Sequence, residues 1–182
     1  MKFLRTAAIL LTLLFSSICA QGNMSVGAGL VVSLPMGNFS DAANVGFGGT
    51  GSFEMGFTPQ LVGIGRIGYI SYGTESEHLS FSTVPLLLGA KYFFVPHLGV
   101  YGIGKLGLNF FSTTTETPSV SAGGFSFGGS SFSASSTEFT FALGAGYELP
   151  LSDNFILDVA GTVNIISDFT NIQLRAGVKT GI

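Results

Sequence analysis

Residues 138–149 read EFTFALGAGYEL, and this stretch shows the pattern that the rest of the chain repeats. Phe139, Phe141 and Leu143 begin a row of apolar side chains that continues on every second residue to Leu149. The residues between them are acidic, hydroxyl-bearing or small. Successive side chains of a β-strand point to opposite faces of a sheet, so this alternation predicts a strand with one apolar face and one small, polar face.

The same period of two recurs along the whole chain. The expected strands are residues 24–34, 45–58, 61–72, 81–94, 100–111, 138–149, 155–165 and 172–182. Each is about ten to fourteen residues long, whereas strands of globular proteins most often have about five or six. A tilted strand needs about 9–11 residues to cross the apolar zone of a bilayer. These segments are therefore long enough to span a membrane.

The connections between the expected strands alternate in length. Short turns near residues 59–60, 95–98 and 150–154 alternate with connections at 35–44, 73–80, 112–136 and 167–170, which include the longest loop. Outer-membrane barrels have short turns on the periplasmic rim and longer loops on the outer rim. An even number of strands then places both chain termini on the periplasmic side.

The positions of the charges favour the same architecture. All five basic residues beyond residue 20 fall within the expected strands, and each can be assigned to the small, polar face. An Arg or Lys that faces lipid at mid-bilayer costs about 2–4 kcal/mol, so the polar face should line the inside. A soluble barrel such as a lipocalin has the opposite arrangement. Because hydrocarbon cannot satisfy backbone N–H and C=O groups, the strands must also close. The sequence predicts an all-β fold, a closed eight-stranded antiparallel up-and-down transmembrane β-barrel.

Charged side chains should fill the lumen of this barrel. Eight strands enclose a lumen that side chains just fill, and the many glycines of the polar face leave room for long charged groups. We expect a structural network of ion pairs, more plug than pore. Glu54 and Arg66 would be cross-strand neighbours if the Pro59 hairpin used a three-residue loop. The expected members of the network are Glu54, Arg66, Lys91, Lys105, Glu138, Glu148, Asp158, Arg175 and Lys179.

Composition excludes several other classes of protein. Only 9% of the 182 residues are charged, against roughly 25% in soluble domains. A single Cys and a net charge of −3 fit neither a disulfide scaffold nor a nucleic-acid binder. Residues 1–20 have a basic start, a short apolar run and a small-residue end, which predicts a signal peptide cleaved before Gln21. The barrel domain is then residues 21–182. Cys19 leaves a lipoprotein anchor as the alternative.

Three segments carry a resemblance to a known family. They are VSLPMGNF at residues 32–39, VPLLLGAKYF at 84–93 and NIQLRAGV at 171–178. With these segments, residues 21–182 resemble the eight-stranded OmpA/OmpX-like outer-membrane β-barrel domains of Gram-negative bacteria. The resemblance implies the bacterial outer membrane as the location, its lipids as surroundings and the barrel-assembly machinery as a partner during insertion. Such domains commonly end in an aromatic residue, whereas this chain ends in Ile182.

The sequence offers little catalytic chemistry. We expect no metal and no cofactor, because His78 and His97 lie in connections on opposite rims. His78-Leu79-Ser80, with Glu75 and Glu77 nearby, resembles the His-x-Ser pair and acid of an outer-membrane lipid A deacylase. Ser and Glu are also ordinary loop residues, so we favour no catalytic residues and keep a lipid-modifying hydrolase as an alternative.

The longest connection, residues 112–136, is rich in Ser, Thr and Gly and contains Phe125, Phe127 and Phe132. It lacks enough apolar surface to fold alone, and we expect an extracellular loop or a hairpin that extends the fifth and sixth expected strands. Exposed aromatic residues on such a loop suit recognition of an extracellular partner. We therefore favour a non-enzymatic structural or surface-interaction role. A narrow, porin-like passive channel for small solutes is the other alternative.

Overall fold

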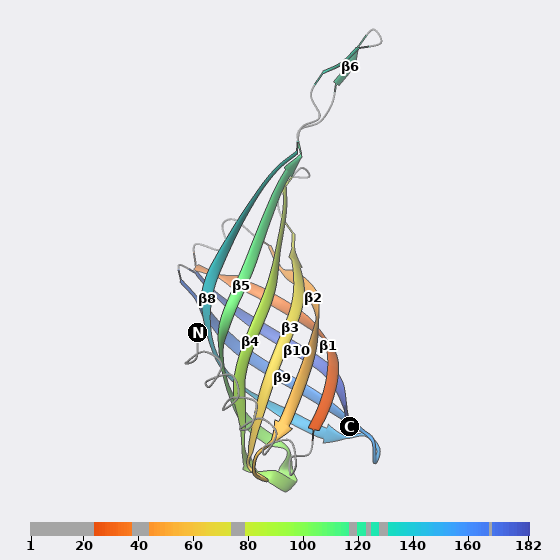
Figure 1. Ribbon diagram of the computed structural model, residues 1–182, viewed down its shortest axis with the longest axis vertical. Coiled ribbons are helices and arrows are strands. Elements are labelled where there is room, and N and C mark those ends of the chain that lie inside the picture. Colours follow the sequence, from red (N-terminus) through yellow and green to blue (C-terminus); the bar gives the residue numbers. More distant parts are fainter. Residues whose placement is uncertain are drawn as a thin grey trace, which may run out of the picture.

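The computed structural model describes residues 24–37, 44–73, 79–116, 120–122, 125–127, 131–167 and 169–182. Within these residues, eight long strands form a barrel, and a small two-stranded sheet and one short 3-10 helix accompany them (Figure 1). The long strands are β1 (Met24–Met36), β2 (Gly46–Gly56), β3 (Leu61–Tyr72), β4 (Leu79–Val95), β5 (Val100–Glu116), β8 (Ser131–Pro150), β9 (Phe155–Ile166) and β10 (Phe169–Gly181). The small sheet consists of β6 (Val120–Ala122) and β7 (Phe125–Phe127), and the helix is η2 (Pro96–Leu98).

The eight long strands form one closed barrel in the order β1-β10-β9-β8-β5-β4-β3-β2. Every neighbouring pair is antiparallel, and β1 closes the barrel by pairing with β10 from Ser25↔Gly181 to Met36↔Thr170. The predicted fold class is thereby confirmed. Among the described residues, no helix is long and apolar enough to cross a membrane.

The alternation of residues divides inside from outside as the sequence predicts. Leu30, Leu88 and Phe47 are 75%, 65% and 64% exposed on the outer wall. Thr50, Ser52 and other polar residues between the outward-facing ones are buried in the lumen. The outside of the barrel is therefore apolar and the inside polar, which is the arrangement of a barrel whose solvent is lipid.

Most predicted boundaries lie within a few residues of the observed ones, and the main difference concerns residues 112–136. Expected as a connection, this segment instead begins and ends as strand, because β5 and β8 remain paired from Val100↔Tyr147 out to Glu116↔Ser131. The structure therefore shows the second expectation, in which the segment extends the two neighbouring strands, β5 and β8. Ser and Thr are compatible with it because strand pairing satisfies the backbone and the hydroxyl groups tolerate water.

The first short turn differs from the register suggested by the sequence. It is centred on Pro59, with the Phe57 amide bonded to the Leu61 carbonyl at 2.9 Å. Thr58 Oγ1 accepts a hydrogen bond from the Leu61 amide at 2.9 Å, which stabilises this turn. As a result Arg66 lies opposite Ser52, and Glu54 lies opposite Ile64. The expectation that Glu54 and Arg66 are cross-strand neighbours was wrong.

Candidate functional site

Three buried carboxylates meet in the half of the lumen nearest the short turns. Glu54 comes from the end of β2, and the β8–β9 register places Glu148 opposite Asp158. Carboxylate oxygens of the three residues lie within 4.8 Å of one another. Like charges at this separation repel strongly away from water, so the group requires cations beside it.

Lys91, on β4, supplies the central cation. Its Nζ lies 2.6 Å from Glu54 Oε1, 2.8 Å from Glu148 Oε1 and 3.1 Å from Asp158 Oδ2. The Lys91 side chain is completely buried. Its ammonium group therefore occupies the place between the three carboxylates and links β4 to β2, β8 and β9.

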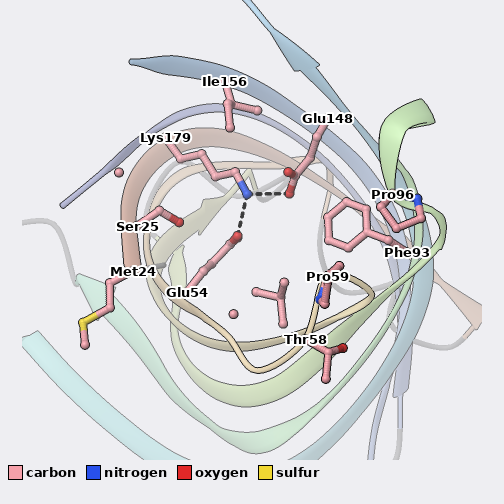
Figure 2. Close-up of a pocket in the computed structure, with 13 residues that line it drawn as sticks. Met24, Ser25, Glu54, Thr58, Pro59, Phe93, Pro96, Glu148, Ile156 and Lys179 are labelled. Carbon is pink, nitrogen blue, oxygen red and sulfur yellow. Dashed lines mark hydrogen bonds and ion pairs between the residues drawn. The ribbon is translucent and has the colours of Figure 1, made fainter. Parts of the chain in front are cut away.

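Two further cations from β10 complete the cluster. Lys179 Nζ lies 2.8 Å from Glu54 Oε2 and 2.7 Å from Glu148 Oε1, and Figure 2 shows it between these two carboxylates. Arg175 Nη1 donates to Asp158 Oδ2 at 2.8 Å, while its Nε donates to Thr50 Oγ1 at 2.9 Å. We call the six residues of these ion pairs the charge cluster: Glu54, Lys91, Glu148, Asp158, Arg175 and Lys179.

Tyr101 belongs to this site although the predicted network omits it. Its hydroxyl donates a hydrogen bond to Asp158 Oδ1, and Lys91 Nζ lies 4.5 Å from the centre of its ring. Tyr101 is fully buried. Its position on the polar face of the expected strand 100–111 could have indicated that its side chain points into the lumen. Residue type alone did not, because other aromatic residues of the chain face lipid.

The other three predicted members of the network lie apart from these ion pairs. Arg66 and Lys105 are buried in the lumen, but no ion pair joins either of them to another described residue. Glu138 is only partly buried, and it too has no ion pair within the described part of the chain. The structure thus brings together six of the nine predicted residues.

Polar side chains continue the filling of the lumen beyond the charge cluster. Asn109 accepts a hydrogen bond from Thr83 Oγ1 at 3.1 Å and donates one to Thr140. Asn164 donates to Asn171 at 2.8 Å. Val31, Ile70 and Tyr72 then form a buried apolar cluster. Between the charge cluster and this apolar cluster, described side chains accordingly occupy the lumen, as expected for eight strands.

A cavity of about 470 Å³ opens at the short-turn end of the barrel. Its lining includes Met24, Thr58, Pro59 and Pro96 at the rim, and Glu54, Glu148 and Lys179 of the charge cluster (Figure 2). The ion pairs between these last three residues form the inner wall of the cavity. The cavity is a vestibule in front of the cluster.

Several sequence-based candidates fall outside what the structure describes. Glu75, Glu77 and His78 lie outside the described residues, as does the Ser80 side chain. The side chains of Phe125, Phe127 and Phe132 are also outside the described part. The hydrolase alternative and the role of these aromatic residues therefore stay predictions.

An apolar exterior, a closed wall and a charge-filled interior define the class of transmembrane β-barrels. The chain belongs to the family described as "Outer membrane protein beta-barrel domain", whose sequence model matches residues 6–180. It is an integral β-barrel protein of the bacterial outer membrane. None of the curated protein sequences compared with the chain matches it.

Solved structures share this fold at low sequence identity. Ail, the attachment invasion locus protein of Yersinia pestis, is 17% identical, with a TM-score of 0.64 over 89% of this chain and 99% of that one. A major outer membrane protein from Thermus thermophilus is 16% identical, with a TM-score of 0.64 over 88% and 99%. Neisserial surface protein A is 17% identical, with a TM-score of 0.56 over 87% and 97%. At these identities the likeness concerns the fold alone.

Proposed function

We propose that this barrel is a non-enzymatic membrane anchor that presents residues 112–136, the projecting hairpin, to an extracellular partner. In this proposal residues 1–20 direct export, the barrel begins at Gln21, and the barrel-assembly machinery inserts it. The short turns and both termini then face the periplasm. Outer-membrane lipids surround the apolar wall.

The observation that carries the proposal is the unequal length of the strands. β8 pairs with β9 only from Thr140↔Ile166 toward the short turns, yet it pairs with β5 as far as Ser131↔Glu116. Residues 131–139 therefore continue past the end of β9 at Ile166, and Figure 1 shows β5 and β8 extending well above the rest of the barrel. Such an extension adds nothing to the closure of the barrel wall, so its use lies outside the membrane.

The chemistry of the projecting hairpin limits its partner. Ser112, Ser133, Ser135 and Ser136 are exposed, and Glu116 is the single charged residue of the segment. Ail has been crystallised with the heparin analogue sucrose octasulfate. A sulfated polyanion needs Arg or Lys, and residues 112–136 contain neither. We infer an uncharged partner surface, bound by hydroxyl and backbone groups.

Deleting the hairpin tests the proposal. The deletion variant joins Phe111 to its cross-strand partner Ser136 through an Asn-Gly turn, which suits a two-residue hairpin and keeps the β5–β8 register. The control variant changes Leu151→Ser in a short turn at the opposite rim. Both should give a folded, heat-modifiable barrel, because the closed pairing of the wall is retained.

Two measurements on intact cells then distinguish the outcomes. Proteinase K should cut wild type within residues 112–136 and leave the barrel whole. Cells should be retained on an extracellular-matrix gel only when the hairpin is present, and heparin-coated surfaces should retain neither form. A protected hairpin, or retention that survives the deletion, would show that this segment is not the interaction site.

A further inference from the structure

The described lumen contains more buried positive charge than buried negative charge. Eight charged side chains there are at least nine-tenths buried. The cations are Arg66, Lys91, Lys105, Arg175 and Lys179, and the anions are Glu54, Glu148 and Asp158. Five cations against three anions leave a surplus of two positive charges (5 − 3 = 2). The barrel wall and the lipid around it have low dielectric constants, so a surplus of charge there is costly unless a counter-charge lies close by.

The surplus resides on two particular residues. The ion pairs of the charge cluster assign all three buried carboxylates to Lys91, Arg175 and Lys179. Arg66 is 6% exposed, and its Nε and Nη2 find no hydrogen-bond acceptor among the described residues. Lys105 is 2% exposed, and no hydrogen bond or ion pair joins it to another described residue. Two buried donors of Arg66 thus have no acceptor, and the Lys105 ammonium has no counter-ion, within the part of the chain that the structure describes.

The strand register brings these two cations to the same part of the lumen. Arg66 on β3 lies opposite Leu87 of β4, and Lys105 on β5 lies opposite Gly89 of the same strand. A Cβ atom added at Gly89 would lie 2.9 Å from Lys105 Cγ. Because glycine has no Cβ atom, the Lys105 side chain can pass across β4. Adjacent strands are about 4.8 Å apart, and two long side chains easily span the two-strand separation.

We propose that the lumen binds one small inorganic anion, of halide size, between Arg66 and Lys105. The guanidinium and ammonium groups both donate charge-assisted hydrogen bonds, which favour an anion over a neutral acceptor. The anion is small because side chains fill an eight-stranded lumen. In addition, the lining of neither described cavity includes Arg66 or Lys105. The proposal is independent of the role of the projecting hairpin.

Bromide is the probe for this site. Wild-type protein is refolded from urea into detergent micelles with bromide as the only small anion, so that no access route through the folded barrel is required. Crystals should give an anomalous peak within hydrogen-bond distance of Arg66 and Lys105. A map without a bromide peak there, or one in which water alone contacts both groups, overturns the proposal.

Variants provide a second readout in solution. Melting temperature is compared in chloride and in gluconate at equal ionic strength, since gluconate is too large for the site. Wild type should be more stable in chloride. Lys105→Glu supplies an internal carboxylate beside Arg66 and balances the lumen, so it should fold and lose the chloride effect together with the bromide peak.

Lys179→Met is the matched control, because it removes a buried cation that already has two carboxylate partners. Its melting temperature should fall in both salts while the difference between the salts is kept. An undiminished chloride effect in Lys105→Glu would contradict the proposal. If a variant fails to fold, the anomalous bromide map of the wild-type protein still tests whether an anion binds between Arg66 and Lys105.

Discussion

At the scale of single residues, Lys91 makes more ion pairs than any other described side chain. Its ammonium group contacts Glu54, Glu148 and Asp158, which come from three different strands. Removing one partner of a buried ion pair leaves a charge without compensation, and this is far more destabilising than the loss of an exposed pair. Lys91 should therefore determine the stability of the barrel.

We expect Lys91→Met to lower the free energy of unfolding by about 3–5 kcal/mol, the range for breaking a buried pair. The measurement is the midpoint of urea unfolding in lipid vesicles. Lys179→Met should have a smaller effect, because Lys179 lines the vestibule and water there can solvate the carboxylates left behind. Equal losses in the two variants would contradict the central role of Lys91.

At the scale of elements, glycines on the inner face allow neighbouring strands to approach closely. A Cβ at Gly144 of β8 would stand 2.1 Å from the carbonyl oxygen of Gly161 on β9. By contrast, a Cβ at Gly161 points outward and comes no nearer than 3.5 Å, to the Leu174 side chain. The first position excludes any side chain unless the strands move apart, whereas the second has room for a methyl group.

Gly144→Ala should consequently destabilise the barrel by roughly 1–3 kcal/mol, as overpacking does. The same substitution at Gly161 should change stability by no more than about 0.5 kcal/mol. Urea midpoints and heat-modifiable migration on gels measure both effects. A tolerated Gly144→Ala would mean that β8 and β9 can separate there without loss of hydrogen bonds.

At the scale of the whole molecule, the charge cluster, the polar pairs beyond it and the apolar cluster around Ile70 close the lumen in series. No described cavity passes through them, and the vestibule has the ion pairs as its inner wall. The passive-channel alternative requires an open path that these side chains occupy. The arrangement instead favours an anchor whose function lies on its outer rim.

Planar bilayers that contain the purified protein should therefore show no conductance steps above the bare membrane. A wide porin of 16–18 strands, which encloses an aqueous channel, is the positive control. Reproducible steps that change size in Lys91→Met would favour the channel and exclude a permanently closed lumen.

The sequence by itself determined the fold class, the strand number and the two faces of the wall. These follow from local alternation, since a strand in lipid must be apolar outside and closed along its edges. It also placed all five cations of residues 21–182 on the inner face. Lys91 and Lys105 show the limit of this reasoning, because both sit on inward positions of clear strands and yet only Lys91 has ion-pair partners among the described residues.

Only the tertiary structure decided which charges meet. Partners such as Lys91 and Asp158 are far apart in the chain, and their contact depends on the register of every strand between them. A turn centred one residue differently changes each cross-strand neighbour, as Arg66 and Ser52 demonstrate. Periodicity carries no information about register, because the apolar and polar faces look the same after a shift of two residues.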